Sequence, residues 1–218
     1  MSTNLSKQIH CPSCGKVSQT RMWPGIDRVA NPEQRERILE ESLCCWECPE
    51  CGYKMQLVYP CLYHDREQKF LILMDPNQKE QTLNKKAMAE NQPADAKKRI
   101  VNSVEELKEK ILIFESGLND AACELAKLAV LQMVESRLGV TPQKAYFSSV
   151  SEKNNQITFV FAFEDEESKP IYQKTRYDVY RKSLEVVESL HFNEYGNSFL
   201  RVDMEMARQM LEAFQNMN

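Results

Sequence analysis

The sequence predicts an α+β protein in which a small cysteine-bearing β part precedes a larger part built from helices and antiparallel strands. Three observations support this prediction. Two near-copies of a CPxCG motif occur among short strand-like segments in residues 1–75, a polar stretch follows, and capped helices alternate with strand patterns from residue 100 onward. We therefore expect domains at residues 1–75 and 100–218, joined by a linker at residues 76–99.

The two motifs are Cys11-Pro12-Ser13-Cys14-Gly15 and Cys48-Pro49-Glu50-Cys51-Gly52. The two-residue spacing lets a tight turn direct both sulfurs of a motif at one point, about 2.3 Å away when the ion is zinc. The glycine after the second cysteine can adopt a positive φ, so backbone N–H groups can turn toward the thiolates. Together the motifs predict one structural Zn²⁺ ion held by Cys11, Cys14, Cys48 and Cys51.

Three other interpretations of these cysteines stay open. They could be ordinary buried thiols, although two full copies of the motif argue against that. One CxxC could be a redox pair, but such a pair should follow a strand and open a helix, which the start of this chain does not favour. Iron could replace zinc, because ligand type alone does not separate the two metals in a four-sulfur site.

The second motif also has an ambiguity of register, because Cys45 and Cys48 form an overlapping CxxC pair. Only Cys48 and Cys51 have the internal proline and the following glycine of the first motif, so we assign this pair as ligands. We expect Cys44 and Cys45 to be packing residues, and His10 is a weaker candidate ligand.

Composition limits the classes of protein. The net charge is −4 and 42% of the residues are hydrophobic, which is ordinary for a globular protein. There is no apolar run of about 18 residues and no apolar segment near the N-terminus, so we expect neither a membrane span nor a signal peptide. Eight cysteines in such a chain favour a reducing cytoplasm and metal binding over disulfides.

The cysteine-bearing part should contain short strands and one helix. We expect a helix over Glu33–Ser42, with Asn31 as its N-cap and Pro32 at its first position, lying on the surface. This layer is too small to bury much apolar surface, so the metal should supply most of its stability, on the order of 10 kcal/mol. The expected strands are Val17–Trp23, Leu43–Trp46, Tyr53–Tyr59 and Phe70–Met74.

The second part has clearer signals. A capping box at Ser103 begins a helix that Gly117 ends, and Asn119 caps a helix to Leu138 that is apolar on most faces and should be central. Two further helices are expected, over Thr175–Leu190 and after Asp203. The expected strands are Tyr146–Val150, Ile157–Phe163, Ile171–Tyr172 and Phe199–Val202.

No catalytic group is predicted. The three histidines, His10, His64 and His191, have no partner at the spacing of a metal site or a catalytic triad. The acidic run over residues 164–167 is expected to be a solvated loop, with a general-acid pair or a cation site as the alternative.

These features resemble the bacterial CpXC domain proteins over about residues 8 to 135. Beyond the two CPxCG motifs, the resemblance depends on Tyr59-Pro60, Tyr63-His64-Asp65, Lys69-Phe70, Asp75-Pro76 and the helical segment over residues 99–120. It implies a cytoplasmic bacterial protein that binds zinc through Cys11, Cys14, Cys48 and Cys51, and it implies no activity.

We expect a non-enzymatic adaptor whose zinc ribbon contacts a protein partner, because a closed four-sulfur site leaves no position for water or substrate. A nucleic-acid-binding ribbon is one alternative, with Arg21, Trp23, Arg28 and Lys54 as contributors. A thiol-based redox or metal-centred enzyme is another. The pattern does not predict an oligomeric state.

Overall fold

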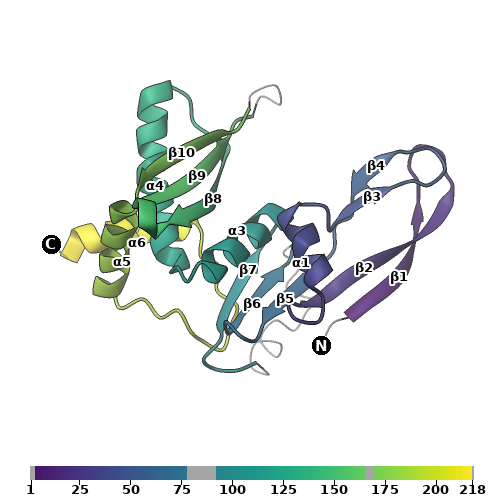
Figure 1. The fold of residues 1–218 in the computed structure, drawn as a ribbon, viewed down its shortest axis with the longest axis horizontal. Coiled ribbons are helices and arrows are strands. Elements are labelled where there is room, and N and C mark those ends of the chain that lie inside the picture. The colour runs from purple at the N-terminus through teal and green to yellow at the C-terminus, as the bar shows by residue number, and fades with distance from the viewer. Residues whose placement is uncertain (1–2, 78–91, 165–168, 218) are drawn as a thin grey trace. The chain divides into compact units, whose positions relative to one another are not determined.

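The computed structural model describes residues 3–77, 92–164 and 169–217 (Figure 1). The chain forms two compact units, one from Met1–Lys108 with Tyr195–Leu200, and one from Glu109–Glu194 with Arg201–Asn218. The described residues form five α-helices and three sheets, so the predicted α+β class is confirmed. Whether residues 1–75 and 100–218 are separate domains stays a prediction.

A five-stranded mixed sheet is the framework of the first unit. Its spatial order is β1-β2-β5-β6-β7, with antiparallel, parallel, antiparallel and parallel pairs in turn. The strand β6, predicted with its correct bounds, is at most 1% exposed along its whole length, as expected for an apolar run buried on both faces. The strands are β1 (Thr3–His10), β2 (Val17–Asp27), β5 (Cys61–Asp65), β6 (Phe70–Met74) and β7 (Lys97–Val101).

Two hairpins bear the CPxCG motifs at their turns. One joins β1 to β2, with His10 opposite Val17, and the other joins β3 (Cys45–Glu47) to β4 (Lys54–Gln56), with Glu47 opposite Lys54. This pair of hairpin turns is the arrangement that the zinc-ribbon prediction requires.

The helix α1 (Pro32–Leu39) stands between the two hairpins in the chain. It was predicted from its proline, and Asn31 and Pro32 occupy the N-cap and first positions as expected. The Asn31 side chain makes no capping bond to the helix and instead accepts a hydrogen bond from the backbone N–H of Asp27 (3.4 Å). One detail of the prediction is wrong, because the helix does not lie wholly on the surface and Ile38 is fully buried.

The edge of β7 is covered by residues 195–200, which return to the first unit. Leu200 donates its N–H to the carbonyl of Lys98 (3.0 Å) and accepts from the N–H of Ile100 (3.1 Å). The strand expected at Phe199–Val202 is reduced to this bridge, in which Leu200 pairs with Arg99. The contact shields a sheet edge that would otherwise expose unpaired backbone groups.

The C-terminal end of the stretch expected to be a linker, residues 76–99, is part of a strand in the structure. Residues 78–91 lie outside the described residues, but Lys97–Arg99 form the first part of β7. Lys98 is only 1% exposed, and its Nζ donates to the carbonyls of Pro93 (3.0 Å) and Gly196 (2.9 Å). Long cationic side chains can be buried when backbone carbonyls accept from the ammonium group, which composition alone does not reveal.

In the second unit the helices α4 and α5 pack against an antiparallel sheet of order β10-β9-β8, and α6 packs on α4 and α5. The central helix α4 contacts α5, α6 and β8, as its nearly uniform apolar pattern predicted. Asn119 caps α4 by accepting from the N–H of Ala122 (2.9 Å), and Gly139 ends it at φ 71°. The elements are α3 (Val104–Glu115), α4 (Asp120–Leu138), β8 (Lys144–Ser151), β9 (Gln156–Ala162), β10 (Ile171–Arg176), α5 (Asp178–Ser189) and α6 (Met204–Met217).

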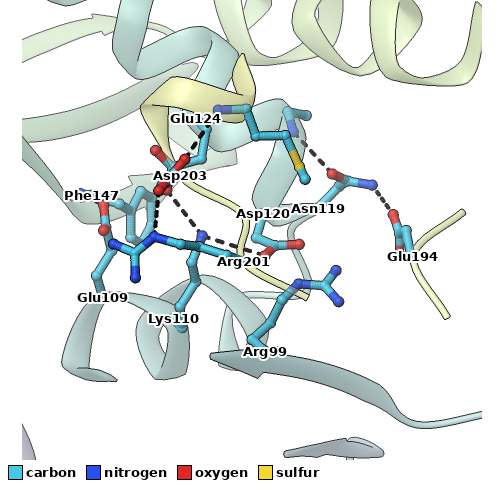
Figure 2. Close-up of polar contacts among 12 residues, drawn as sticks. Arg99, Glu109, Lys110, Asn119, Asp120, Glu124, Phe147, Glu194, Arg201 and Asp203 are labelled. Carbon is cyan, nitrogen blue, oxygen red and sulfur yellow. Dashed lines mark hydrogen bonds and ion pairs between the residues drawn. The ribbon is translucent and has the colours of Figure 1, made fainter. Parts of the chain in front are cut away.

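Five charged side chains are buried together in this unit, a feature that the sequence did not indicate. Glu109, Lys110, Asp120 and Glu124 are labelled in Figure 2, and Lys127 is the fifth. Lys127 Nζ lies 2.8 Å from Glu109 Oε1 and 2.9 Å from Glu124 Oε2. Lys110 Nζ lies 3.0 Å from Glu124 Oε1 and 3.4 Å from Asp120 Oδ2. Burial opposes the charge on both lysines, but the neighbouring carboxylates prevail and raise the pKa of each.

Replacing Lys127 with methionine should therefore be costly. The variant removes the ammonium group that pairs with the buried carboxylates of Glu109 and Glu124. We expect it to lose about 3–5 kcal/mol of unfolding free energy. The folded-state pKa of Lys127 is raised above 10.5, so the deficit should stay constant from about pH 7 to 10 and shrink only as the pH rises through that raised pKa.

Urea titration followed by helical circular dichroism measures this loss. The matched control is Arg208→Met, which breaks the exposed pair of Arg208 with Glu205 and should change stability by less than about 0.5 kcal/mol. Equal effects of the two substitutions would contradict the assigned role of the buried charges.

Candidate metal centre

The two CPxCG turns have the same backbone geometry. In each, the N–H of the glycine donates to the carbonyl of the first cysteine at 2.9 Å, from Gly15 to Cys11 and from Gly52 to Cys48. The two glycines have φ angles of 71° and 72°, a left-handed conformation that other residues adopt at a cost. The glycine that identified each motif in the sequence is therefore required by the shape of the turn.

The four predicted ligands come together. The sulfurs of Cys11, Cys14, Cys48 and Cys51 all lie within 4.8 Å of one another. The Cys11–Cys51 sulfur pair is separated by 3.6 Å and the Cys14–Cys48 pair by 3.7 Å. Bonds of about 2.3 Å in a tetrahedron require sulfur separations of about 3.8 Å, whereas a disulfide requires about 2.05 Å. The cluster thus has the dimensions of a site that could bind a metal ion.

The centre has a covered side and an open side. Cys11 and Cys48 are each 2% exposed and pack with Trp46, which is itself buried. Cys14 and Cys51 are exposed. The covered side is completed by partly buried apolar side chains, those of Ile9, Met55 and Leu57.

The electrostatics of the four thiols favour a bound cation. Burial disfavours the Cys11 thiolate, but the N–H groups of Cys14 and Ser13 and the thiols of Cys48 and Cys51 lower its pKa to about 7. The N–H of Lys16 lowers the pKa of Cys14, yet desolvation and the three neighbouring thiols raise it to about 12. Four protein sulfurs therefore do not all ionise together near neutral pH by themselves, and a divalent cation would supply the compensating charge.

Of the two overlapping CxxC pairs in the second motif, the structure brings the Cys48 and Cys51 pair into the cluster of four sulfurs. Cys44 is 3% exposed and outside the cluster, and Cys45 pairs with Gln56 in the β3–β4 hairpin, its Sγ 3.5 Å from the carbonyl of Glu41. Both lie apart from the four sulfurs, as expected of non-ligands.

The other candidate ligands also lie apart. His10 is exposed and pairs with Val17 at the end of the β1–β2 hairpin. Cys61 and Cys123, which the sequence did not assign to the site, are buried. Among the described residues, only the four motif cysteines form a group with the spacing of metal ligands.

Three of the four residues considered for nucleic-acid binding by the ribbon have other contacts. Trp23 is 9% exposed, so its ring is covered. Arg28 pairs with Asp65 (3.3 Å) and Glu67 (3.0 Å), and the exposed Lys54 pairs with Glu47 (3.2 Å). The fourth residue, Arg21, is exposed on β2.

A hollow of about 630 Å³ adjoins the second hairpin, which sequence reasoning missed. It is formed between the end of α1 and the strands β3 and β4, by residues that come together only when the chain folds back after the helix. Lining side chains include Arg37, Ser42, Cys45, Glu47, Lys54 and Gln56.

A model of the family described as CpXC protein matches residues 9–127, which is more than half of the chain. The match includes both CPxCG turns and ends within α4. No curated protein and no solved structure matches the chain. Within the described part of the chain, every helix is too short or too polar to span a membrane.

Replacing one ligand should release the metal and loosen the hairpins. We expect Cys14→Ser or Cys51→Ser to reduce the bound metal from one ion per chain, measured by elemental mass spectrometry, because three thiolates hold it far less tightly. Both tryptophans, Trp23 and Trp46, lie in the first unit, so tryptophan fluorescence should report earlier melting.

The helices α4, α5 and α6 lie in the second unit, and their circular dichroism should melt as in the unmodified protein. Cys45→Ser is the matched control and should keep both the metal and the melting curves. If fluorescence and circular dichroism instead report one transition, and the ligand variants shift it equally by both probes, the two units fold as one.

Proposed function

The chain belongs to the CpXC protein family, and from this premise we propose that it holds one structural zinc ion and acts as a non-enzymatic interaction module in a reducing cytoplasm. The observation that supports the proposal best is the set of four sulfurs from two identical turns, spaced for tetrahedral binding of one ion.

Zinc fits this site better than iron does. Both metals accept four thiolates, so ligand type alone does not decide between them. The centre is exposed at Cys14 and Cys51, however, where oxidants have access. Zinc has no redox chemistry of its own and tolerates such exposure, which favours it as the resident metal.

A structural role for the metal follows from its full shell. Catalytic zinc sites keep one position for water or substrate, whereas four thiolates fill a tetrahedron. The ion would instead join the β1–β2 and β3–β4 hairpins at their turns, supplying stability that the small apolar cluster around Trp46 does not provide.

The partner surface in this proposal is the hollow beside β3 and β4. Its position on the second hairpin couples it to the metal, because loss of the ion would free the turn between the two strands. Lys54 and Gln56 project from β4 with exposed side chains and offer polar contacts to a protein partner.

A comparative pull-down tests the interaction role. The intact zinc-loaded chain and the variant Lys54→Glu/Gln56→Arg are used as baits in a native lysate, with Lys7→Glu on β1 as the matched exposed control. We expect a protein retained by the unmodified chain and the control to be lost with the double variant. Retention that is the same for all three baits, or no retention at all, would contradict the role of this surface.

Thiol labelling distinguishes this role from a thiol-based enzyme. In the zinc-loaded protein we expect Cys45 to react with a maleimide quickly and the four ligand cysteines slowly, with Cys14 and Cys51 becoming reactive once a chelator removes the metal. Peptide mass spectrometry identifies the labelled sites. Rapid labelling of a ligand cysteine with zinc retained would favour the enzyme instead.

A further inference from the structure

The two faces of the β10-β9-β8 sheet differ in composition. On one face the side chains of Ile157, Phe159 and Phe161 are fully buried in the core of the second unit. Because side chains alternate along a strand, residues 156, 158, 160 and 162 of β9 lie on the opposite face. The strand registers then identify which residues of β8 and β10 share that second face.

An aromatic row crosses this second face. Tyr146 of β8 and Tyr172 of β10 are both paired with Val160 of β9, so the three side chains stand side by side. Tyr172 is 63% exposed, while Tyr146 and Val160 are half-buried. Two strand spacings separate the tyrosines, which places them about 10 Å apart.

Cations surround the aromatic row on the same face. Lys174 pairs with Thr158 and Arg176 with Gln156, so both follow Tyr172 along β10 at outward positions, and both are exposed. Lys144 occupies the outward position next to Tyr146 on β8. Neither Lys174 nor Arg176 forms an ion pair with any described residue.

Acidic residues are missing from these strands. The three strands contain no aspartate or glutamate, although the chain has 32 acidic residues and a net charge of −4. The sequence shows no basic stripe, because only Lys174 and Arg176 are close in the chain, and the register of the sheet brings Lys144 of β8 to the same face. The concentration of positive charge on this face is therefore local and opposes the overall charge.

We propose that this face of the β10-β9-β8 sheet binds single-stranded nucleic acid. The rings of Tyr146 and Tyr172 offer stacking surfaces for two bases, and Lys174 and Arg176 contact the phosphates between and beside them. Open sheet faces that combine aromatic and basic side chains bind single strands in this way, because every base has a stacking surface and the backbone is uniformly charged.

Single strands fit this face better than the other anionic partners do. The face of a sheet presents no helix or isolated ribbon that could enter a duplex groove, where paired bases are read. An acidic peptide would use the cations but would gain little from paired tyrosines. This inference uses residues of the second unit alone and is independent of the metal centre and the hollow beside β4.

Fluorescence anisotropy of the full-length, zinc-loaded chain with a labelled oligo-dT tests the proposal. We expect Lys174→Glu/Arg176→Glu to weaken binding at least tenfold, and to reduce the slope of log K against log salt by about 1.4 for two lost phosphate contacts. The charge-matched control is Lys182→Glu/Arg208→Glu on α5 and α6, which should retain most of the affinity and the slope.

A second pair of variants tests the stacking role. Tyr172→Ala should weaken binding roughly tenfold, whereas Tyr172→Phe should keep it, since stacking needs the ring and not the hydroxyl. Tyr172 is mostly exposed, so neither substitution should unfold the unit, which circular dichroism verifies.

Three results would overturn the proposal. The unmodified chain could fail to bind oligo-dT at low salt, or both charge-reversed double variants could lose affinity equally. A poly-glutamate peptide could also compete as well as unlabelled oligo-dT while Tyr172→Ala binds normally, which would identify the face as a site for acidic peptides.

Discussion

The two CPxCG hairpins of the first unit meet at four sulfurs that lie within 4.8 Å of one another. Desolvation and the neighbouring thiols raise the pKa of Cys14 to about 12, whereas the backbone N–H groups of the turn and the thiols of Cys48 and Cys51 lower the pKa of Cys11 to about 7. Such a shell is stable when a cation occupies its middle. The two glycines at φ 71° and 72° maintain the turns that aim the sulfurs, and the contact with Trp46 covers one side.

The rest of the molecule is stabilised differently. In the first unit, β6 and its neighbours bury a continuous apolar layer that does not include the ligands, so the hairpin turns stand apart from the main core. In the second unit, α4 is the central element, and two lysines and three carboxylates replace part of an apolar core. Buried ion pairs contribute little net stability but are costly to break, which makes them a constraint on packing.

The sequence predicted the features that local chemistry determines. The clustering of the four motif cysteines, the strand β6 and the caps at Asn119 and Gly139 depend on short motifs or uniform patterns, and the structure has them as expected. The helix α1 was also found, although its burial through Ile38 was not.

The features that were missed depend on pairing and packing that local patterns do not specify. The polar strand β1 is held by pairing with β2, and β7 includes Lys98, whose ammonium group donates to carbonyls of residues 93 and 196. The hollow beside β4 and the cationic face with Tyr146 and Tyr172 likewise arise from packing and register.

X-ray absorption at the zinc edge of protein purified without chelator tests the central claim most directly. The account predicts a first shell of four sulfurs at about 2.3 Å around one zinc ion per chain, with no nitrogen or oxygen. A shell with fewer sulfurs, or with light-atom ligands, would contradict a metal centre made by Cys11, Cys14, Cys48 and Cys51.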